Sequence, residues 1–567
     1  MNRLTVEPVP TPMTVFSSTY SMAASAAMRL PWSALIIDSL SALGCTPYDS
    51  ESKAHPDSAS QALMSRSYLE RILTACVYDV AIQSPLDDGA TLSERLGNRV
   101  LMKREDLQPV FSFKLRGAYN KMNRLSEEAR KKGVICASAG NHAQGVALSA
   151  KQLGIKATIV MPRTTPDIKV NAVRRLGGRV VLHGDSYDEA SQHASKLVEE
   201  KGMTYVPPYD DPDVIAGQGT VGMEILYQHP RDIHAIFIAV GGGGLAAGIA
   251  VYVKQLRPDI RIIAVEPETA PTLARSLETG RRVKLEQVGL FADGVAVRQV
   301  GKTNWPLLRQ YVDDVVLVSD DEICAAIKDI FDDTRSIMEP AGALGVAGAK
   351  KYVERTGIRD KTLVAVNCGA NMNFSRLGHV AERAELGEHR EAVFAVTIPE
   401  RPGSFKQFCE AIGKRGITEF NYRYADPTQA HVYAGIQLSN GDEERQALRD
   451  ELEEAGYPVL DLTEDEMAKV HVRHMVGGRG GGVEDEILYR FEFPERPGAL
   501  LKFLSRMGRR WNISLFHYRN HGAAYGKVLV GMQVPEAERA RCVAYLDKLG
   551  YRYAEETENP AYRLFLS

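Results

Sequence analysis

The chain has 567 residues, of which 44% are hydrophobic and 25% charged, and its formal net charge is −3. This length predicts three or four domains, and the composition is typical of a globular protein that buries large cores. With 69 basic and 72 acidic residues, no basic excess or basic run indicates binding to nucleic acid or to an anionic membrane. No apolar run approaches the ~20 residues that span a bilayer. We therefore expect small molecules and further copies of the chain as partners, with no nucleic acid and no membrane.

Residues 1–63 differ from the rest, because they are rich in Ser, Ala, Pro and Met. An organellar transit peptide has a similar composition but is usually rich in Arg, and only Arg3 and Arg29 occur here. We favour a disordered or leader-like extension. The seven cysteines stand singly, without the spacing of a disulfide framework or a metal site, which suits a reducing compartment. The expected location is cytoplasmic, or a plastid or mitochondrion if the extension is a transit peptide.

Between about residues 99 and 369, short apolar runs rich in β-branched residues alternate with segments of helical periodicity. Near-continuous apolar strands between helices are typical of parallel strands buried on both faces. The pattern predicts an open α/β fold, in which ligands bind at the carboxyl ends of the strands. The expected strands are 134–136, 157–160, 180–182, 236–240, 262–265, 315–318 and 363–366.

A different pattern occurs twice after residue 384. The run Glu-Arg-Pro-Gly occurs at residues 400–403 and again at residues 495–498, each time after an expected strand. Further along the chain, the seven residues 417–423 resemble the seven residues 513–519. Two blocks preserved at nearly one offset indicate a duplicated domain of β-α-β-β-α-β type. The expected units are the extension at 1–63, an α/β part at 64–384, a first repeat at 391–472, a glycine-rich linker at 473–485 and a second repeat at 486–567.

Lys114 stands between Phe113 and Leu115 at the expected start of a helix. Apolar neighbours favour partial burial, which lowers the pKa of a lysine and yields the free amine that condenses with an aldehyde. Taken alone, a solvated helical lysine is the more common case. The motifs that follow reverse this interpretation.

A run of small and polar residues follows the strand expected at 134–136 and opens a helix. Small residues expose backbone N–H groups at a helix N-terminus, where a carboxylate can bind. The neutral side chain of Asn141 can also hydrogen-bond a phenolic oxygen. The alternative is an ordinary turn with Asn141 as the N-cap of the helix. The run consists of Ser138, Ala139, Gly140, Asn141 and His142.

Four glycines and a leucine follow the strand expected at 236–240 and open the next helix. Glycines let a phosphate approach the backbone, and a helix N-terminus supplies N–H donors and the positive end of the dipole. No Gly-Lys-Ser/Thr follows, which excludes the P-loop of nucleotide-binding proteins. The predicted phosphate loop consists of Gly241, Gly242, Gly243, Gly244 and Leu245.

The run from Gly217 to Gly222 matches the dinucleotide-binding pattern G-x-G-x-x-G. We do not expect it to bind a dinucleotide, because it lies inside a helix-like segment at 212–228 and no strand leads directly into it. Close packing of helices is the better interpretation.

Cys368 follows the last expected strand and precedes Gly369, Ala370 and Asn371. A neutral thiol at this position can meet a pyridine nitrogen without forcing it to become protonated, as an aspartate would. A small buried thiol with no further role is the alternative.

These motifs occur in the order seen in threonine dehydratases, and residues 64–384 resemble that family. The resemblance implies a fold-type II pyridoxal-phosphate enzyme, similar to the tryptophan synthase β subunit, and therefore an α/β catalytic domain. The repeats after residue 384 resemble the paired α+β, ACT-like regulatory domains of the biosynthetic, isoleucine-inhibited form. Many threonine dehydratases have Ser where Cys368 stands, whereas related serine dehydratases have Cys. The preference for threonine over serine is therefore open.

The resemblance also implies roles for the motifs in converting L-threonine to 2-oxobutanoate and ammonia, the first step of isoleucine biosynthesis. Lys114 would form the Schiff base with pyridoxal 5′-phosphate and act as general base. Asn141 would bind the ring hydroxyl, Cys368 the ring nitrogen and the loop at 241–245 the phosphate. The run at 138–142 would bind the substrate carboxylate. No metal is expected.

For the C-terminal half, we expect isoleucine, with valine as a second candidate, to bind between the repeats near Tyr422 and Tyr518. Such regulation requires contacts between subunits, so a homotetramer is expected by family analogy. An L-serine dehydratase or racemase of the same fold is one alternative. A catalytically inactive amino-acid sensor is another, although it would be expected to have lost Lys114 or the glycines. The repeats can also be pure packing modules that bind nothing.

Overall fold

The computed structural model describes residues 66–567 apart from 166, 466–467, 470–471, 475–482, 495–498, 508–509, 520–524, 561, 563–565 and 567. The extension expected at 1–63, the second Glu-Arg-Pro-Gly run and the centre of the glycine-rich linker lie outside the described residues.

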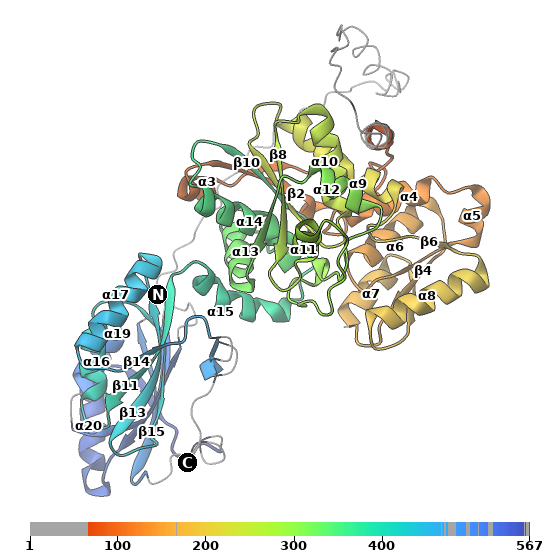
Figure 1. Cartoon of the computed structure of the whole chain (residues 1–567). Helices are drawn as coiled ribbons and strands as arrows, with labels where there is room; N and C mark the ends of the chain where they lie inside the picture. The colour runs from red at the N-terminus through yellow and green to blue at the C-terminus, as the bar shows by residue number, and fades with distance from the viewer. Residues whose placement is uncertain are drawn as a thin grey trace, which may run out of the picture. The chain divides into compact units, whose positions relative to one another are not determined.

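The α/β part contains a six-stranded sheet in the order β1-β2-β10-β7-β8-β9. Figure 1 labels β2, β8 and β10 of this sheet. Its neighbouring strands are parallel, except that β1 runs antiparallel to β2. Every residue of β7 is buried, as expected of a strand covered on both faces. The strands are β1 (Leu86–Asp88), β2 (Arg99–Arg104), β7 (Ala235–Ala239), β8 (Arg261–Pro267), β9 (Asp314–Val318) and β10 (Thr362–Asn367).

A second, four-stranded parallel sheet has the order β5-β4-β3-β6. The seven strands expected from the sequence are confirmed, but they are divided between two sheets. The hydrophobic pattern identifies strands and does not specify their partners. The strands of this sheet are β3 (Val134–Ala137), β4 (Ala157–Met161), β5 (Arg179–Leu182) and β6 (Thr204–Tyr205).

Helices connect and cover these strands, with α14 packed on β7, β9 and β10, and α10 on β7. The helices of this part include α3 (Ala90–Leu96), α4 (Lys114–Asn123), α5 (Glu127–Lys132), α6 (Asn141–Leu153), α7 (Asp167–Arg175), α8 (Tyr187–Lys201), α9 (Pro212–Gln228), α10 (Gly244–Leu256), α11 (Thr272–Thr279), α12 (Asn304–Tyr311), α13 (Asp320–Thr334), α14 (Pro340–Thr356) and α15 (Leu377–Gly387). The site is built around the first residues of α4, α6 and α10.

The G-x-G-x-x-G run lies inside helix α9 and packs against other helices. A Cβ on Gly217 would lie 2.7 Å from the carbonyl oxygen of Arg116, at the start of α4. A Cβ on Gly219 would lie 3.0 Å from the carbonyl oxygen of Gly248 in α10. Glycine is needed here for close helix contacts, which confirms the predicted close packing of helices.

Each C-terminal repeat has the predicted order β-α-β-β-α-β. The first repeat contains β11 (Glu391–Pro399), α16 (Ser404–Ile412), β12 (Ile417–Arg423), β13 (Gln429–Gln437), α17 (Gly441–Glu454) and β14 (Val459–Asp461). The second contains β15 (Glu486–Pro494), α19 (Ala499–Met507), β16 (Asn512–Arg519), β17 (Tyr525–Gln533), α20 (Arg539–Leu549) and β18 (Arg552–Glu555).

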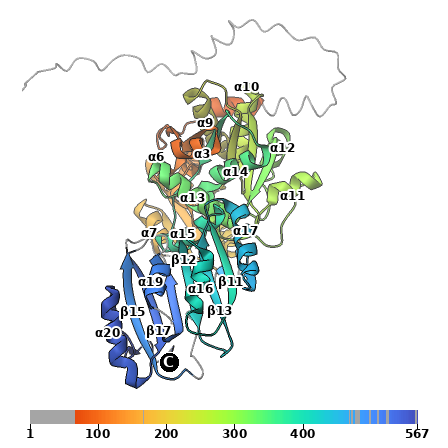
Figure 2. The same ribbon diagram turned by 90° about the vertical axis from the view of Figure 1, so that its left-hand side faces the viewer.

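The two repeats share one eight-stranded antiparallel sheet, in the order β14-β11-β13-β12-β16-β17-β15-β18. They meet where β12 pairs with β16, so that Phe420 faces Tyr518 and Tyr422 faces Phe516. The order is symmetrical about this pair because the two strands occupy equivalent places in their repeats. The helices α16, α17, α19 and α20 lie along this sheet (Figures 1 and 2). The sequence predicted each repeat but not their joint sheet.

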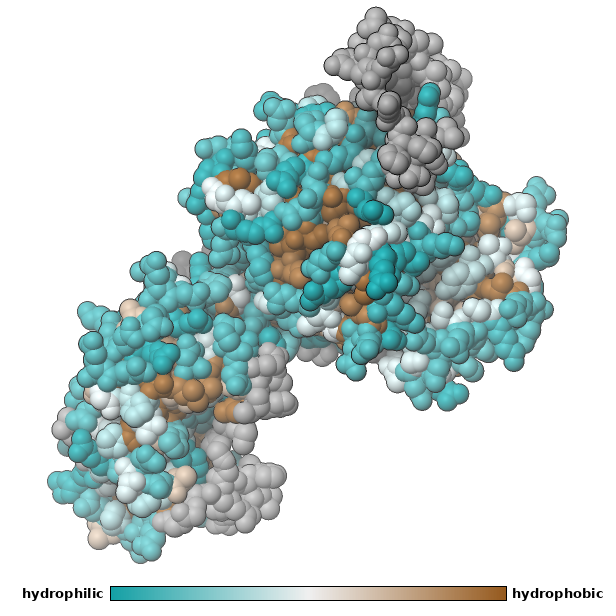
Figure 3. All heavy atoms as spheres, viewed as in Figure 1, coloured by the Kyte–Doolittle hydropathy of each residue, from teal (hydrophilic) through white to brown (hydrophobic). Residues whose placement is uncertain are grey.

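The face of the molecule seen in Figure 3 is mostly hydrophilic, and hydrophobic residues gather there in a few patches. Large apolar side chains that stand out include Tyr227, Leu290 and Phe374, which are 72%, 73% and 81% exposed. None of the described helices combines the length and the hydrophobicity needed to cross a membrane.

Candidate active site

Lys114 is the first residue of α4, and its side chain is partly buried. Its Nζ donates to the carbonyl of Pro208 at 3.1 Å and lies 5.2 Å from the centre of the Phe113 ring. Burial lowers the pKa of Lys114 to about 8, although the nearby Cys368 and Glu339 oppose the shift. A lysine with this pKa is partly a free amine near neutral pH, the form that attacks an aldehyde.

Backbone contacts join the lysine segment to the end of β10. Ser112 and Gly369 form an isolated antiparallel bridge, and the N–H of Ala370 donates to the carbonyl of Phe111 at 2.9 Å. A Cβ on Gly369 would overlap the carboxylate of Glu339, so a larger residue would displace that side chain. The two motifs, far apart in the sequence, therefore meet at one place.

The run at 138–142 connects β3 to α6, and Gly140 is the N-cap residue of that helix. Within the described chain no side chain caps α6, so Asn141 is not its N-cap and the first N–H groups of the helix remain available to an anion. His142 is buried, and its Nε2 lies 2.8 Å from the carbonyl of Val206. Burial, reinforced by Lys114, lowers the pKa of His142 to about 3. His142 is therefore neutral, donates to Val206 and holds the loop in place.

The side chain of Asn141 lies between two polar residues that the sequence analysis did not select. Its Oδ1 accepts from Nδ2 of Asn371 at 2.7 Å, and its Nδ2 donates to Oε1 of Glu339 at 2.5 Å. Burial, with a contribution from Asp293, raises the pKa of Glu339 to about 7. The amide of Asn141 is thus held from both ends.

The glycine loop leads from β7 into α10, and the residues from Gly241 to Leu245 are buried. No described side chain caps α10, which leaves its first N–H groups free for a ligand. A Cβ on Gly242 would overlap the ring of Tyr209. The carbonyl of Gly242 accepts from Asn304 Nδ2 at 2.6 Å and from the N–H of Gly301 at 3.0 Å, so this peptide is fixed in one orientation.

Cys368 is 4% exposed, and its Sγ donates to the carbonyl of Ala341 at 3.2 Å. Burial, together with the carboxylate of Glu339, raises the pKa of the Cys368 thiol. The sulfur is therefore neutral at physiological pH. This is the electrostatic property that the sequence analysis required of a partner for a pyridine nitrogen.

A buried ion network lies directly behind the lysine. Arg116, which is fully buried, bonds Glu105 at 2.8 Å and Glu224 at 2.6 Å. The Nζ of Lys103 bonds the other oxygen of Glu224 at 2.6 Å. The two carboxylates raise the pKa of Arg116 despite its burial. This network fixes the first turn of α4, from which Lys114 projects.

Tyr422 and Tyr518, the expected effector residues, belong to the core of the C-terminal sheet, with 2% and 1% of their surface exposed. The hydroxyl of Tyr422 donates to Glu400. The other carboxylate oxygen of Glu400 accepts from Asn512 Nδ2 at 2.9 Å. The first Glu-Arg-Pro-Gly run is therefore bonded both to a core tyrosine and to the second repeat.

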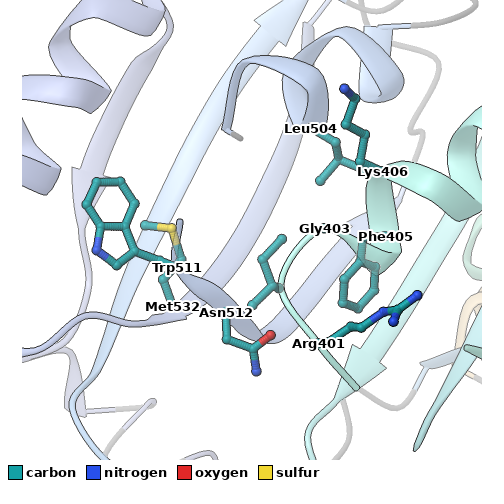
Figure 4. Close-up of a pocket in the computed structure, with 9 residues that line it drawn as sticks. Arg401, Gly403, Phe405, Lys406, Leu504, Trp511, Asn512 and Met532 are labelled. Carbon is teal, nitrogen blue, oxygen red and sulfur yellow. The ribbon is translucent and has the colours of Figure 1, made fainter. Parts of the chain in front are cut away.

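A small cavity of about 20 Å³, room for one water molecule, lies between the two repeats (Figure 4). Phe405 lines it, and the ring centre of Phe405 lies 4.8 Å from that of Tyr422. An amino acid fits this cavity only if its walls move. The lining residues are Arg401, Gly403, Phe405, Lys406, Leu504, Trp511, Asn512, Ile513 and Met532.

Family models match most of the described chain. Residues 77–369 match the pyridoxal-phosphate dependent enzymes, and 382–472 and 477–566 match the C-terminal regulatory domain of threonine dehydratase. The chain is 59% identical over 508 residues to the biosynthetic L-threonine dehydratase of Burkholderia multivorans, covering 89% of this chain and 100% of the relative. It is 53% identical over 500 residues to the enzyme of that name from Escherichia coli, covering 88% and 97%. The chain belongs to the biosynthetic threonine dehydratases.

A solved structure supports the same assignment. The processed form of threonine deaminase isoform 2 from Solanum lycopersicum has a TM-score of 0.56 and 52% identity, covering 60% of this chain and 97% of that chain. The fold-type II class, with C-terminal regulatory domains, is confirmed. The cofactor of this family is pyridoxal phosphate.

The residues of the site fit that cofactor. The uncapped N-terminus of α10 offers N–H donors to a phosphate, and Lys114 offers an amine to an aldehyde. Cys368 offers a neutral thiol to a ring nitrogen. Glu339, Asn371 and Asn304 were missed by sequence reasoning. In the sequence, Glu339 is marked only by the proline that follows it at the start of a helix, and Asn371 only by its place three residues after Cys368. Asn304 is marked only by its place at the start of α12.

Proposed function

We propose that the chain deaminates L-threonine to 2-oxobutanoate and ammonia, the first step of isoleucine biosynthesis. The observation that carries this proposal is the position of Lys114 at the start of α4, in a segment that is bridged to the end of β10 next to Cys368. Similarity to named biosynthetic threonine dehydratases along their whole length supports threonine as the substrate.

The motifs share the tasks of this reaction. When bound, pyridoxal phosphate supplies the electron sink for the bond that breaks at Cα. Lys114 Nζ would hold the cofactor and would take the α-proton of the substrate. The N–H groups at 138–142 would bind the substrate carboxylate, those at 241–245 would bind the phosphate, and Asn141 would bind the ring oxygen. The neutral Cys368 would leave the ring nitrogen unprotonated, which would favour elimination over racemisation.

The second part of the proposal is feedback inhibition by isoleucine, bound between the repeats near Tyr422 and Tyr518. The matches to the regulatory domain of threonine dehydratase and the position of the small cavity support it. Arg401 can pair with a carboxylate and Glu400 with an ammonium group, while Phe405 offers an apolar wall. Because the cavity is small, binding must separate the repeats, and this change would lower the affinity for threonine.

We further propose that the chain forms a homotetramer in a reducing compartment, the cytoplasm. The exposed apolar side chains support contacts between copies of the chain. The free thiols of the described cysteines suit a reducing compartment.

Absorbance spectroscopy of the purified protein, combined with an assay for 2-oxobutanoate, tests the function. We expect a visible band from the lysine-bound cofactor that is lost in Lys114→Ala and kept in Lys151→Ala, a change of an exposed lysine on α6. L-threonine should turn over faster than L-serine, and isoleucine should slow the reaction. A featureless spectrum after addition of pyridoxal phosphate would overturn the cofactor site. Faster turnover of serine would overturn the substrate, and kinetics unchanged by isoleucine would overturn the effector.

A further inference from the structure

A directional chain of hydrogen bonds leads to Asn141. Nδ2 of Asn371 donates to the carbonyl of Val110 at 2.8 Å and to Oδ1 of Asn141 at 2.7 Å. A backbone carbonyl only accepts hydrogen bonds, so Val110 determines which end of the Asn371 amide is its nitrogen. Both N–H groups of Asn371 are then used. The oxygen of Asn141 must therefore face Asn371.

Glu339 holds the other end of the Asn141 amide. Asn141 Nδ2 donates to Glu339 Oε1 at 2.5 Å, and the backbone N–H of Asn371 also hydrogen-bonds the Glu339 carboxylate. An amide nitrogen carries two hydrogens, so one N–H of Asn141 remains after Glu339 is satisfied. The Asn371 side chain thus donates to Asn141, Asn141 donates to Glu339, and the backbone N–H of Asn371 also donates to Glu339.

Glu339 belongs to the site electrostatically as well as geometrically. Its charge raises the pKa of both Lys114 and Cys368, so it lies near the amine and the thiol. Its side chain is not needed to terminate a helix, because it makes no capping hydrogen bond to α14, which begins at Pro340. Glu339 is only 5% exposed and does not cap the helix, so the burial of its carboxyl group requires another explanation.

We propose that Asn371 and Glu339 are positioning residues for the cofactor. They orient the amide of Asn141 so that its remaining N–H, and not its oxygen, faces the ring oxygen of pyridoxal phosphate. The inference rests on the proposed role of Asn141 as the ligand of that oxygen. If the Asn141 amide were flipped, its oxygen would face the ring oxygen of pyridoxal phosphate. Both atoms are acceptors, so a repulsive contact would replace the hydrogen bond.

The test is a titration of the apoenzyme with pyridoxal phosphate, in which the visible absorbance band measures the bound cofactor and gives the Kd. Repeating the measurement at several pH values gives the pH dependence of the band. Asn371→Asp places an acceptor opposite the oxygen of Asn141 and favours the flipped amide. We expect it to weaken cofactor binding by about tenfold or more and to shift the pH dependence of the band. Asn371→Ala removes the donor without favouring the flip and should have a smaller effect.

The variants of Glu339 test the other end of the chain. Glu339→Ala should weaken cofactor binding by about tenfold, and Glu339→Gln, which keeps an acceptor oxygen, should restore most of the loss. The matched control is Glu266→Gln. Glu266 is a buried carboxyl group whose pKa is also raised to about 7, but it hydrogen-bonds the N–H groups of Leu273 and Ala274 in α11. Its replacement should leave the Kd for pyridoxal phosphate unchanged.

Asn141→Ala separates this inference from the role on which it rests. If that variant binds pyridoxal phosphate like the wild type, the proposed role of Asn141 is wrong. If it binds weakly while Asn371→Asp and Glu339→Ala bind normally, the positioning role is overturned. Thermal unfolding of each apoenzyme shows which variants keep their fold. Should Glu339→Ala not fold, the comparison of Asn371→Asp with Asn371→Ala decides, and equal affinities would overturn the inference.

Discussion

The backbone N–H of Phe113 donates to the carbonyl of Cys368 at 3.3 Å. The residue before the lysine is thus bonded to the residue that carries the thiol. Because this hydrogen bond joins two backbone groups, it holds the start of α4 against the end of β10 independently of the side-chain conformations. Lys114 and Cys368 therefore approach the ligand from a rigid frame, which is what precise positioning of reacting groups requires.

The low pKa of Lys114 predicts how the apoenzyme captures its cofactor as a function of pH. The free amine is the reactive form, and burial has lowered its pKa from 10.5 to about 8. We expect the rate of capture to rise with pH and to level off above about pH 8. Stopped-flow measurement of the visible band at fixed pyridoxal phosphate concentration checks this. A rate that still rises tenfold for each pH unit between 8 and 10 would contradict a buried amine.

The neutral thiol of Cys368 predicts a contrast between two substitutions. Cys368→Ser keeps a neutral donor to the carbonyl of Ala341, and we expect kcat with threonine to fall by less than about tenfold. Cys368→Asp adds a second carboxyl group near Glu339 and favours a protonated ring nitrogen, so we expect kcat to fall by about 100-fold. Exchange of the α-proton with solvent should increase relative to elimination. Equal kcat values for the two variants would show that the charge at this position is unimportant.

The strands and the repeats could be predicted from the sequence because both produce local patterns of hydrophobic residues and turn residues. The sequence could not predict that the parallel strands form two sheets, or that β12 pairs with β16. Strand partners are chosen by tertiary packing, and the same apolar run satisfies several arrangements. The joint C-terminal sheet depends on the match of Phe420 with Tyr518 across the two repeats, which no local pattern contains.

The same distinction applies to the site. Lys114, the glycine loop and Cys368 each stand in a distinctive local motif, and the structure places Lys114 and Cys368 together. Glu339 has no such motif, since it precedes Pro340 like many residues at the start of a helix. Its significance comes from Asn141, which is 198 residues away in the chain, and from burial that raises its pKa. Such long-range polar contacts require a structure.

The ion network behind the lysine predicts a large loss of stability when its centre is removed. Arg116→Met leaves Glu105 and Glu224 buried without their guanidinium partner. We expect the free energy of unfolding of the catalytic domain to fall by about 3–5 kcal/mol, measured by denaturant unfolding of the apoenzyme. Arg124→Met is the control. That side chain is 33% exposed and lies 3.7 Å from Asp213, so its loss should cost less than about 1 kcal/mol.

The glycine loop predicts which glycine tolerates a methyl group. Gly242→Ala would force its Cβ into the ring of Tyr209, so the loop or the ring must move and the phosphate site must change. We expect the Kd for pyridoxal phosphate to rise by about tenfold or more. Gly378→Ala is the control, because a Cβ at that position meets no atom within 4 Å. Unchanged cofactor affinity in Gly242→Ala would show that the loop does not bind the phosphate.

The hydrogen bond between Tyr422 and Glu400 predicts a change in regulation without a change in catalysis. Tyr422→Phe removes one of the donors that hold the Glu400 carboxylate beside the cavity. A hydrogen bond from a neutral hydroxyl contributes about 0.5–1.5 kcal/mol, so we expect the isoleucine concentration for half inhibition to rise by about 2- to 13-fold. The kcat/KM for threonine without isoleucine should stay the same. Tyr553→Phe, which breaks a 2.7 Å bond to Asp547 on the exposed side of the second repeat, should leave inhibition unchanged. If both substitutions raise the half-inhibitory concentration equally, the effect reflects general loosening of the sheet, and the binding site near Tyr422 is wrong.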